Sequence, residues 1–224
     1  MGKLTESANQ LISSIVLRDD YLYDQEIMKH GGAMKQFKDA MLNNGFHFSY
    51  LHEALQYMPR EKKTIVPIVM KCFPETDSVQ DRKELLRWLY FKGLYDAVPM
   101  LIDEFIQNPL NGDILYRWAV ADTIYKMKCP LYASEYMAIV QNREYGIARQ
   151  MIVLLLGSIK CYESIPLLLS YISDEDITLQ TVSALGKIGN TECIPCLEDY
   201  ATSKNHAIRK ETLNAIDRIH KRKR

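Results

Sequence analysis

Cys193 and Cys196 form a Cys-x-x-Cys pair, a spacing used by dithiol redox sites and by one half of a structural zinc site. The redox motif requires a thioredoxin-like context with a strand before it, and the flanking sequence predicts none. A structural zinc needs four ligands, and neither a second cysteine pair nor a histidine pair lies nearby. Because cysteine also packs well as a small hydrophobic residue, we expect passive cysteines, no metal and no cofactor.

A column of arginines is a second candidate for chemistry. Four arginines stand at the same place in successive segments of the chain: Arg82, Arg117, Arg149 and Arg209. They could bind anions as a ladder. Alternatively, each could pair with a loop carboxylate such as Asp113 or Asp174, because a half-buried guanidinium needs a partner.

The arginines belong to a repeat that spans most of the chain. We take Arg149 and its equivalents as the anchor position, and Tyr50 and Thr178 complete this column, whose members lie 29 to 35 residues apart. Apolar residues recur four and seven residues after the anchor, which is one face of a helix. The apolar columns are Ala54, Leu86, Ala121, Val153, Val182 and Leu213, and Tyr57, Leu89, Ile124, Leu156, Leu185 and Ile216.

Two further columns mark the ends of the predicted helices. Seventeen residues after the anchor stand Pro67, Pro99, Ser134, Pro166 and Pro195, and proline is favoured in the first turn of a helix. Four residues before the anchor stand the potential N-caps Ser78, Asp113, Asp174 and Asn205. Each unit is therefore predicted to be two antiparallel helices joined by short loops.

This pattern resembles HEAT repeats, most clearly over 165–189 and 98–124. The resemblance implies an all-α fold, a right-handed α–α superhelix over residues 46–224, with a short basic tail at 221–224. Residues 1–45 lie outside the register. We interpret them as a helical cap with helices near 4–17, 21–30 and 34–42, because the end of a solenoid exposes apolar surface that needs covering.

Trp118 and Asp122 are the third candidate for chemistry, since residues four apart share one helix face. One interpretation is structural, with the tryptophan covering a junction between units. The other is a second resemblance. Trp118, Asp122 and Arg149 are similar to the Trp-x-x-x-Asp and neighbouring Arg of HEAT-like alkylpurine DNA glycosylases, which implies a damaged base shielded or flipped against Trp118.

Composition narrows the classes of function. The chain is 47% hydrophobic and 25% charged, which excludes global disorder. Its formal net charge is zero, so any attraction for an anionic partner must come from local segregation of charge. The sequence shows no apolar run long enough for a membrane span and no leader pattern. Five scattered cysteines suit a reducing compartment, and we expect a cytoplasmic monomer.

Charge is predicted to separate onto two faces. Lysines and arginines flank the apolar stripe of the arginine-bearing helices, whereas carboxylates dominate the proline-bearing helices at Asp103, Glu104, Glu135, Glu198 and Asp199. We therefore expect a non-enzymatic binding or scaffold module with a basic groove for an acidic protein segment, with nucleic acid as another possible partner. The predicted binding residues are Lys83, Arg87, Arg117, Trp118, Arg149, Lys187 and Lys210.

Overall fold

The computed structural model describes residues 22, 25, 27, 31–76, 78–107 and 113–222. Among these residues the regular elements are all helices and no strand occurs, which confirms the all-α prediction. Two compact units make up the chain, residues 1–89 (unit 1) and residues 90–224 (unit 2).

Unit 1 is built around helix α3, which packs against α2 on one side and α4 on the other. Its core includes the wholly buried rings of Phe37 and Trp88, which meet edge to face with centroids 5.0 Å apart. Its elements are α2 (Ala33–Asn43), η1 (Leu51–Tyr57), α3 (Met58–Cys72), η2 (Phe73–Glu75) and α4 (Val79–Leu89).

Helix α2 confirms the predicted helix near 34–42. The helix predicted at 4–17 lies outside the described residues, and so does most of the one predicted at 21–30. The expected boundary between cap and array, at residues 45 and 46, falls inside unit 1 and stays a prediction.

The first repeat differs from its predicted register. Tyr50 was expected inside a helix, but it is extended (φ −119°, ψ 145°) and precedes the 3-10 helix η1, where Glu53 accepts its N–H. Pro67 was expected in a first turn and instead lies within α3. The physical reason is that α3 begins nine residues earlier, at Met58 with Pro59 at its start, and continues across a kink at Glu61 (φ −109°, ψ 25°) before it reaches Pro67.

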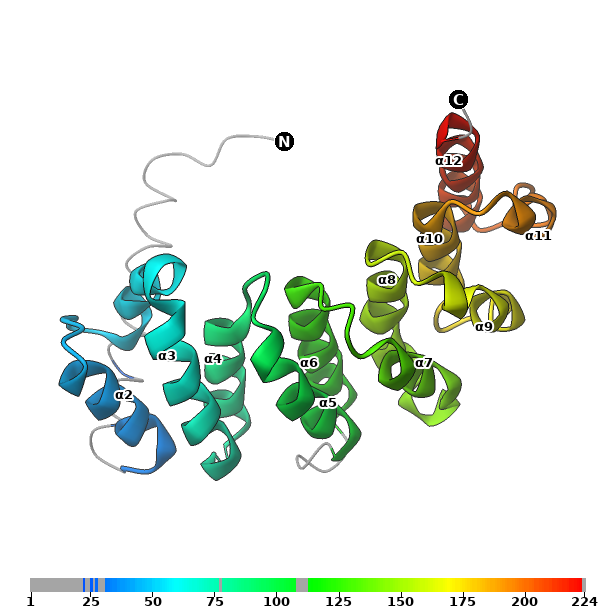
Figure 1. The fold of residues 1–224 in the computed structure, drawn as a ribbon. Coiled ribbons are helices and arrows are strands. Elements are labelled where there is room, and N and C mark those ends of the chain that lie inside the picture. Colours follow the sequence, from blue (N-terminus) through cyan, green and yellow to red (C-terminus); the bar gives the residue numbers. More distant parts are fainter. Residues whose placement is uncertain are drawn as a thin grey trace, which may run out of the picture. The chain divides into compact units, whose positions relative to one another are not determined.

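Unit 2 is a stack of helix pairs (Figure 1). Outer helices carry the proline column, and inner helices carry the anchor column. The outer helices are α5 (Val98–Gln107), α7 (Ala133–Gln141), α9 (Ile165–Ser170) and α11 (Ile194–Glu198). The inner helices are α6 (Ile114–Met127), α8 (Gln150–Ser158), α10 (Thr178–Ile188) and α12 (His206–Arg222). Short 3-10 helices precede some of them: η3 (Tyr95–Ala97), η4 (Arg143–Arg149), η5 (Tyr162–Ser164) and η6 (Thr191–Cys193).

Each outer helix packs on the inner helix that follows it, and each inner helix packs on the next inner helix. The apolar columns form the seam between them. Ala121, Val153 and Val182 are 0% exposed, as predicted for one helix face. Leu213, the same position in α12, is 54% exposed because no described helix covers that side of α12.

The inner helices α8, α10 and α12 approach one another closely at glycines. A Cβ atom built on Gly157 would lie 2.5 Å from the Ala184 Cα of α10. A Cβ atom built on Gly186 would lie 2.5 Å from the Ala215 Cβ of α12. Both glycines come from the repeat register, so the sequence uses small residues where the backbones of neighbouring inner helices meet.

Three of the predicted N-caps are confirmed. Asp113 accepts the N–H groups of the first turn of α6, Asn205 does the same for α12, and Ser78 accepts a weaker bond in α4. The prediction for Asp174 is wrong. Its carboxylate accepts the N–H of Asp176 within the loop, because it is held there by an ion pair with Arg149.

Candidate functional site

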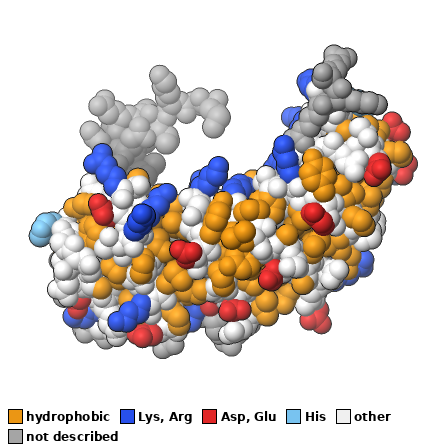
Figure 2. Space-filling view, in the orientation of Figure 1, with side chains coloured by type: hydrophobic (Ala, Val, Ile, Leu, Met, Phe, Trp, Pro, Cys, Tyr) orange, Lys and Arg blue, Asp and Glu red, His pale blue; other side chains and the backbone are white. Residues whose placement is uncertain are grey.

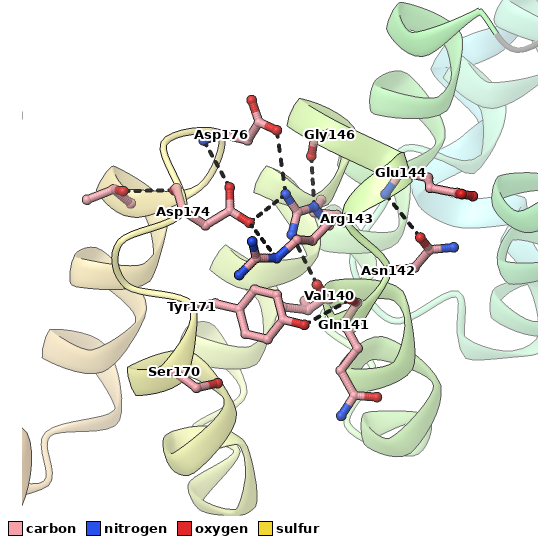
Figure 3. A network of polar contacts seen from close by, with 12 residues as sticks. Val140, Gln141, Asn142, Arg143, Glu144, Gly146, Ser170, Tyr171, Asp174 and Asp176 are labelled. Atoms are coloured by element: carbon pink, nitrogen blue, oxygen red, sulfur yellow. Dashed lines mark hydrogen bonds and ion pairs between the residues drawn. The ribbon is translucent and has the colours of Figure 1, made fainter.

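Arg149 makes polar contacts with residues of two successive helix pairs, and Figure 3 labels its partners Val140, Gly146, Asp174 and Asp176. It is the last residue of η4, is 0% exposed, and donates to the carbonyls of Gly146 and Val140 at 3.0 and 3.2 Å. Its Nη2 atom lies 3.0 Å from a carboxylate oxygen of Asp174 and 3.6 Å from one of Asp176. The guanidinium therefore links the loop before α10 to the end of η4 through these contacts.

The network is balanced in charge. Arg143 completes the network from the solvent side. Its Nε atom lies 3.9 Å from a carboxylate oxygen of Asp174, and its guanidinium carbon lies 5.0 Å from the ring centroid of Tyr171. Two arginines thus face the two carboxylates of Asp174 and Asp176. Since each positive charge has a negative counterpart, this arrangement supports the structural interpretation of Arg149 rather than an anion site.

The other arginines of the column also contact the protein. In unit 2, Arg117 donates its Nε–H to the carbonyl of Phe105 and lies 4.8 Å from the ring centroid of Tyr145. Arg209 donates to the carbonyl of Ser203. In unit 1, Arg82 is buried and lies 5.5 Å from the ring centroid of Phe73. These contacts favour a packing role for the column.

The structure gives Trp118, Asp122 and Arg149 different partners. The indole N–H of Trp118 donates to Gln150, which in turn donates to the carbonyl of Asp176. Asp122 is hydrogen-bonded to Tyr90, while Arg149 is wholly buried against Asp174. The arrangement expected from the glycosylase resemblance, three side chains converging on one base, is therefore not assembled in this structure.

A different cluster does converge on the inner helices of unit 2, and we name it the tyrosine–lysine cluster. Its cations are stacked against aromatic rings. Lys126 lies 5.2 Å from the ring centroid of Tyr90, and Lys128 lies 2.9 Å from that of Tyr125. Lys187, from α10, lies 6.0 Å from the same Tyr125 centroid. The members are Tyr90, Asp122, Tyr125, Lys126, Lys128, Ser158 and Lys187.

Small side chains of α8 make this convergence possible. Tyr125 belongs to α6 and Lys187 to α10, and α8 packs between these two helices. At this level α8 presents Gly157 and Ser158; the Ser158 hydroxyl donates to the carbonyl of Leu154 and lies beside Tyr125. A bulky residue at Ser158 would separate the ring from the amine.

The cluster perturbs its own ionisable groups. Burial alone would raise the pKa of Tyr125, but its contacts with Lys128 and Ser158 and the charges of Lys187 and Lys128 outweigh it, so this pKa is lowered. Burial lowers the pKa of Lys128, and the charge of Lys187 adds to that effect. Burial raises the pKa of Tyr90, helped by its hydrogen bond to Asp122. Tyr125 is thus a polarised hydroxyl among positive charges.

Lys128 is held by an unusual backbone conformation. It caps α6 in the left-handed region (φ 56°, ψ 38°), which non-glycine residues rarely adopt. The same position in each repeat is eleven residues after the anchor residue. Its backbone is left-handed in the four repeats whose inner helices are α4, α6, α8 and α10, at Gly93, Lys128, Lys160 and Gly189. Two of the four are lysines where glycine would fit without strain.

Of this cluster, the sequence predicted Lys187 as a binding residue, but Tyr90, Tyr125 and Lys128 were not predicted. The missed signal is periodic. Tyr90 and Tyr125 stand eight residues after the anchor residue of their repeats, and the next two repeats have Gly157 and Gly186 at the same position. A column that changes from tyrosine to glycine marks a place where neighbouring helices differ in how closely they approach.

The remaining predicted binding residues lie on exposed surface. Lys83 and Arg87 belong to α4 of unit 1, where Arg87 is paired with Glu84 at 2.7 Å, and Lys210 belongs to α12 of unit 2. Figure 2 shows hydrophobic side chains over much of the visible face, with cationic and acidic side chains at separate places among them. A continuous basic groove stays a prediction.

All five cysteines are free. Cys193 is buried and Cys196 half-buried, and burial raises the pKa of both thiols. Within the described part of the chain, no group of three His, Cys, Asp or Glu side chains is arranged to hold a metal ion. No helix in that part has the length and apolar character needed to cross a membrane.

Comparison with known families supports the repeat architecture. Residues 133–217 match the family model for HEAT repeats. This segment runs from α7 into α12, so it covers the stacked pairs that contain the Arg149 network and Lys187. A search of curated proteins gave no match.

Proposed function

Taking residues 133–217 as an array of HEAT repeats, we propose that this chain is a non-enzymatic binding and scaffold module. Its inner helices in unit 2 hold an acidic segment of a partner protein. Stacked helix pairs offer an extended surface, and such repeats generally serve as interaction scaffolds. The observation that carries the proposal is the tyrosine–lysine cluster, where three lysines are stacked on the rings of Tyr90 and Tyr125.

The location of this charge supports the choice of partner. Some positive charges of unit 2 are paired with a carboxylate, as for Arg149 with Asp174 and Arg218 with Glu211 at 2.6 Å. The lysines of the cluster are stacked on the rings of Tyr90 and Tyr125 and bring three positive charges to this part of unit 2. Complementary charge raises the association rate of an acidic partner, and tyrosine rings add contact area at small entropic expense.

We further propose a cytoplasmic monomer. Five free cysteines suit a reducing compartment, and Cys196 is half-buried with no bonded partner sulfur. Size-exclusion chromatography with light scattering tests the oligomeric state.

A pull-down with the purified full chain from its native host tests the function. Charge reversal with Lys126→Glu and Lys187→Glu is expected to reduce capture of the acidic partner, and the difference should shrink as salt rises. The matched control reverses Asp103→Lys and Glu198→Lys, two exposed carboxylates on the outer helices α5 and α11.

The control pair should leave capture unchanged, and circular dichroism should show that all four substitutions keep the fold. If reversal on the outer helices abolishes capture while reversal in the cluster does not, the binding face is wrong and the partner is basic. Release of an alkylated base from duplex DNA by the purified chain would contradict the non-enzymatic assignment.

A further inference from the structure

Leu115, in the first turn of α6, is the most exposed large apolar side chain on any described helix. Leu115 is 67% exposed, its neighbour Ile114 is 39% exposed, and Trp118, one turn further on, is half-buried. Residues three and four apart are neighbours on a helix surface, so these side chains adjoin one another, and we name them the α6 apolar patch. One exposed leucine needs no explanation, but adjoining apolar side chains form a surface that is suited to contact with a partner.

Trp118 is held in place before any partner binds. Its indole N–H donates to the side chain of Gln150 in α8 at 3.4 Å, and Gln150 donates to the carbonyl of Asp176 at 2.8 Å. The ring is therefore connected to the next inner helix and to the loop before α10. Because an ordered aromatic ring loses little conformational entropy on binding, Trp118 gives the patch a rigid contact surface.

Lys126 lies on the same line of α6 as Leu115. Eleven residues separate the two, which is three turns of an α-helix plus about 20°, so they are about 17 Å apart along the helix axis. Lys126 is exposed, and its amine lies 5.2 Å from the ring centroid of Tyr90. Within the described part of the chain Lys126 forms no ion pair, although Asp122 stands four residues earlier on the same line. A carboxylate of a partner can therefore pair with this amine.

We propose that the inner face of unit 2 recognises two features of the partner segment together, an inference that rests on the function proposed above. An apolar side chain of the segment docks on the α6 apolar patch, and a carboxylate pairs with Lys126. Extended backbone advances about 3.3 Å per residue, so a separation of about 17 Å places the two features about five residues apart. Since Asp122 lies between them, the intervening residues of the segment are not acidic. The partner is thus an acidic segment with an apolar anchor residue.

Three fluorescent peptide libraries test this with the full chain. Each has a central glutamate among degenerate uncharged polar residues. In the first library leucine stands five residues away on both sides of the glutamate, which allows either direction of the peptide. In the second library serine takes these places, and in the third the leucines stand only two residues from the glutamate. Fluorescence anisotropy should show the first library binding about tenfold more tightly than either of the others.

Two leucine substitutions form a matched pair of variants. Leu115→Ala removes the centre of the α6 apolar patch, whereas Leu213→Ala removes an exposed leucine of α12 that lies outside it. Because both side chains are exposed, both variants should keep the circular dichroism spectrum of the wild type. Only Leu115→Ala should remove most of the preference for the first library over the second. Lys126→Glu should weaken binding of all three libraries.

Equal affinity for the first and second libraries overturns the apolar anchor, and equal affinity for the first and third overturns the five-residue spacing. In both cases the acidic-segment function survives if Lys126→Glu still weakens binding. If no library binds, this inference is overturned, and the pull-down decides the function separately. A dimer in light scattering that Leu115→Ala abolishes also overturns it, because a second copy of this chain would then cover the patch.

Discussion

Gly157→Ala tests how closely the inner helices approach one another. The added methyl would lie 2.5 Å from the Cα of Ala184, 2.8 Å from its Cβ and 3.0 Å from its carbonyl oxygen. Optimal separations of carbon atoms are about 3.5–4.0 Å, so α8 and α10 must move apart by about 1 Å. The nearest atom is backbone, which cannot rotate away as a flexible side chain would.

Two effects of opposite sign set the magnitude. Overpacking of this kind destabilises by about 1–3 kcal/mol, and the rigid backbone contact points to the upper end of that range. Alanine is favoured over glycine within a helix by about 1 kcal/mol, which offsets part of the loss. We expect Gly157→Ala to reduce the free energy of unfolding by about 2 kcal/mol.

Urea denaturation followed by far-ultraviolet circular dichroism measures this free energy. Ala138→Gly calibrates the helix-propensity contribution alone, because Ala138 is exposed in the middle of α7. A Gly157→Ala protein that is more stable than wild type by the calibrated amount would refute the close approach. Gly186→Ala, whose methyl would meet Ala215 at 2.5 Å, should behave like Gly157→Ala.

Three other substitutions or measurements test further features of unit 2. Arg149→Met should cost about 3–5 kcal/mol by leaving Asp174 without its buried partner, and a calorimetric Tm that hardly changes would contradict this. The pKa of Cys193 is raised to about 11 by burial, so iodoacetamide at pH 8 should label Cys196 first. Because the folded state holds this proton more tightly than the unfolded chain, the associated stability is present below the ordinary pKa of 9.0 and is lost as pH rises towards 11. Leu213→Gln should change the unfolding free energy by less than about 0.5 kcal/mol, since Leu213 is exposed, and a large loss would reveal a covering contact.

Periodicity predicted the helix pairs because the apolar columns are set by local geometry. Ala121, Val153 and Val182 are buried as the offset of four residues predicts. Exposure of Leu213 could not be predicted in the same way, since it depends on whether another helix lies beside α12. The first repeat failed because the chain offers two prolines, and Pro59 rather than Pro67 begins α3.

The candidate site was harder to predict because it depends on distances between helices. Lys187 was identified from its place beside the apolar stripe, but its approach to Tyr125 requires small residues in α8. Burial of Arg149 was also beyond the repeat pattern. The repeat pattern predicts the sequence separation between Arg149 and Asp174. The 0% exposure of Arg149 depends on tertiary contacts with Val140, Gly146 and Asp174, which the pattern does not contain.

The glycine contacts also have a mechanical consequence. Where Gly157 meets Ala184 and Gly186 meets Ala215, only the small alanine methyl groups accompany the backbone contact between neighbouring inner helices, so little there can be compressed. We therefore expect the distances between the inner helices α8, α10 and α12 to stay nearly constant when unit 2 bends. Under a pulling force, the outer helices α9 and α11, which are only six and five residues long, should yield before the inner helices separate.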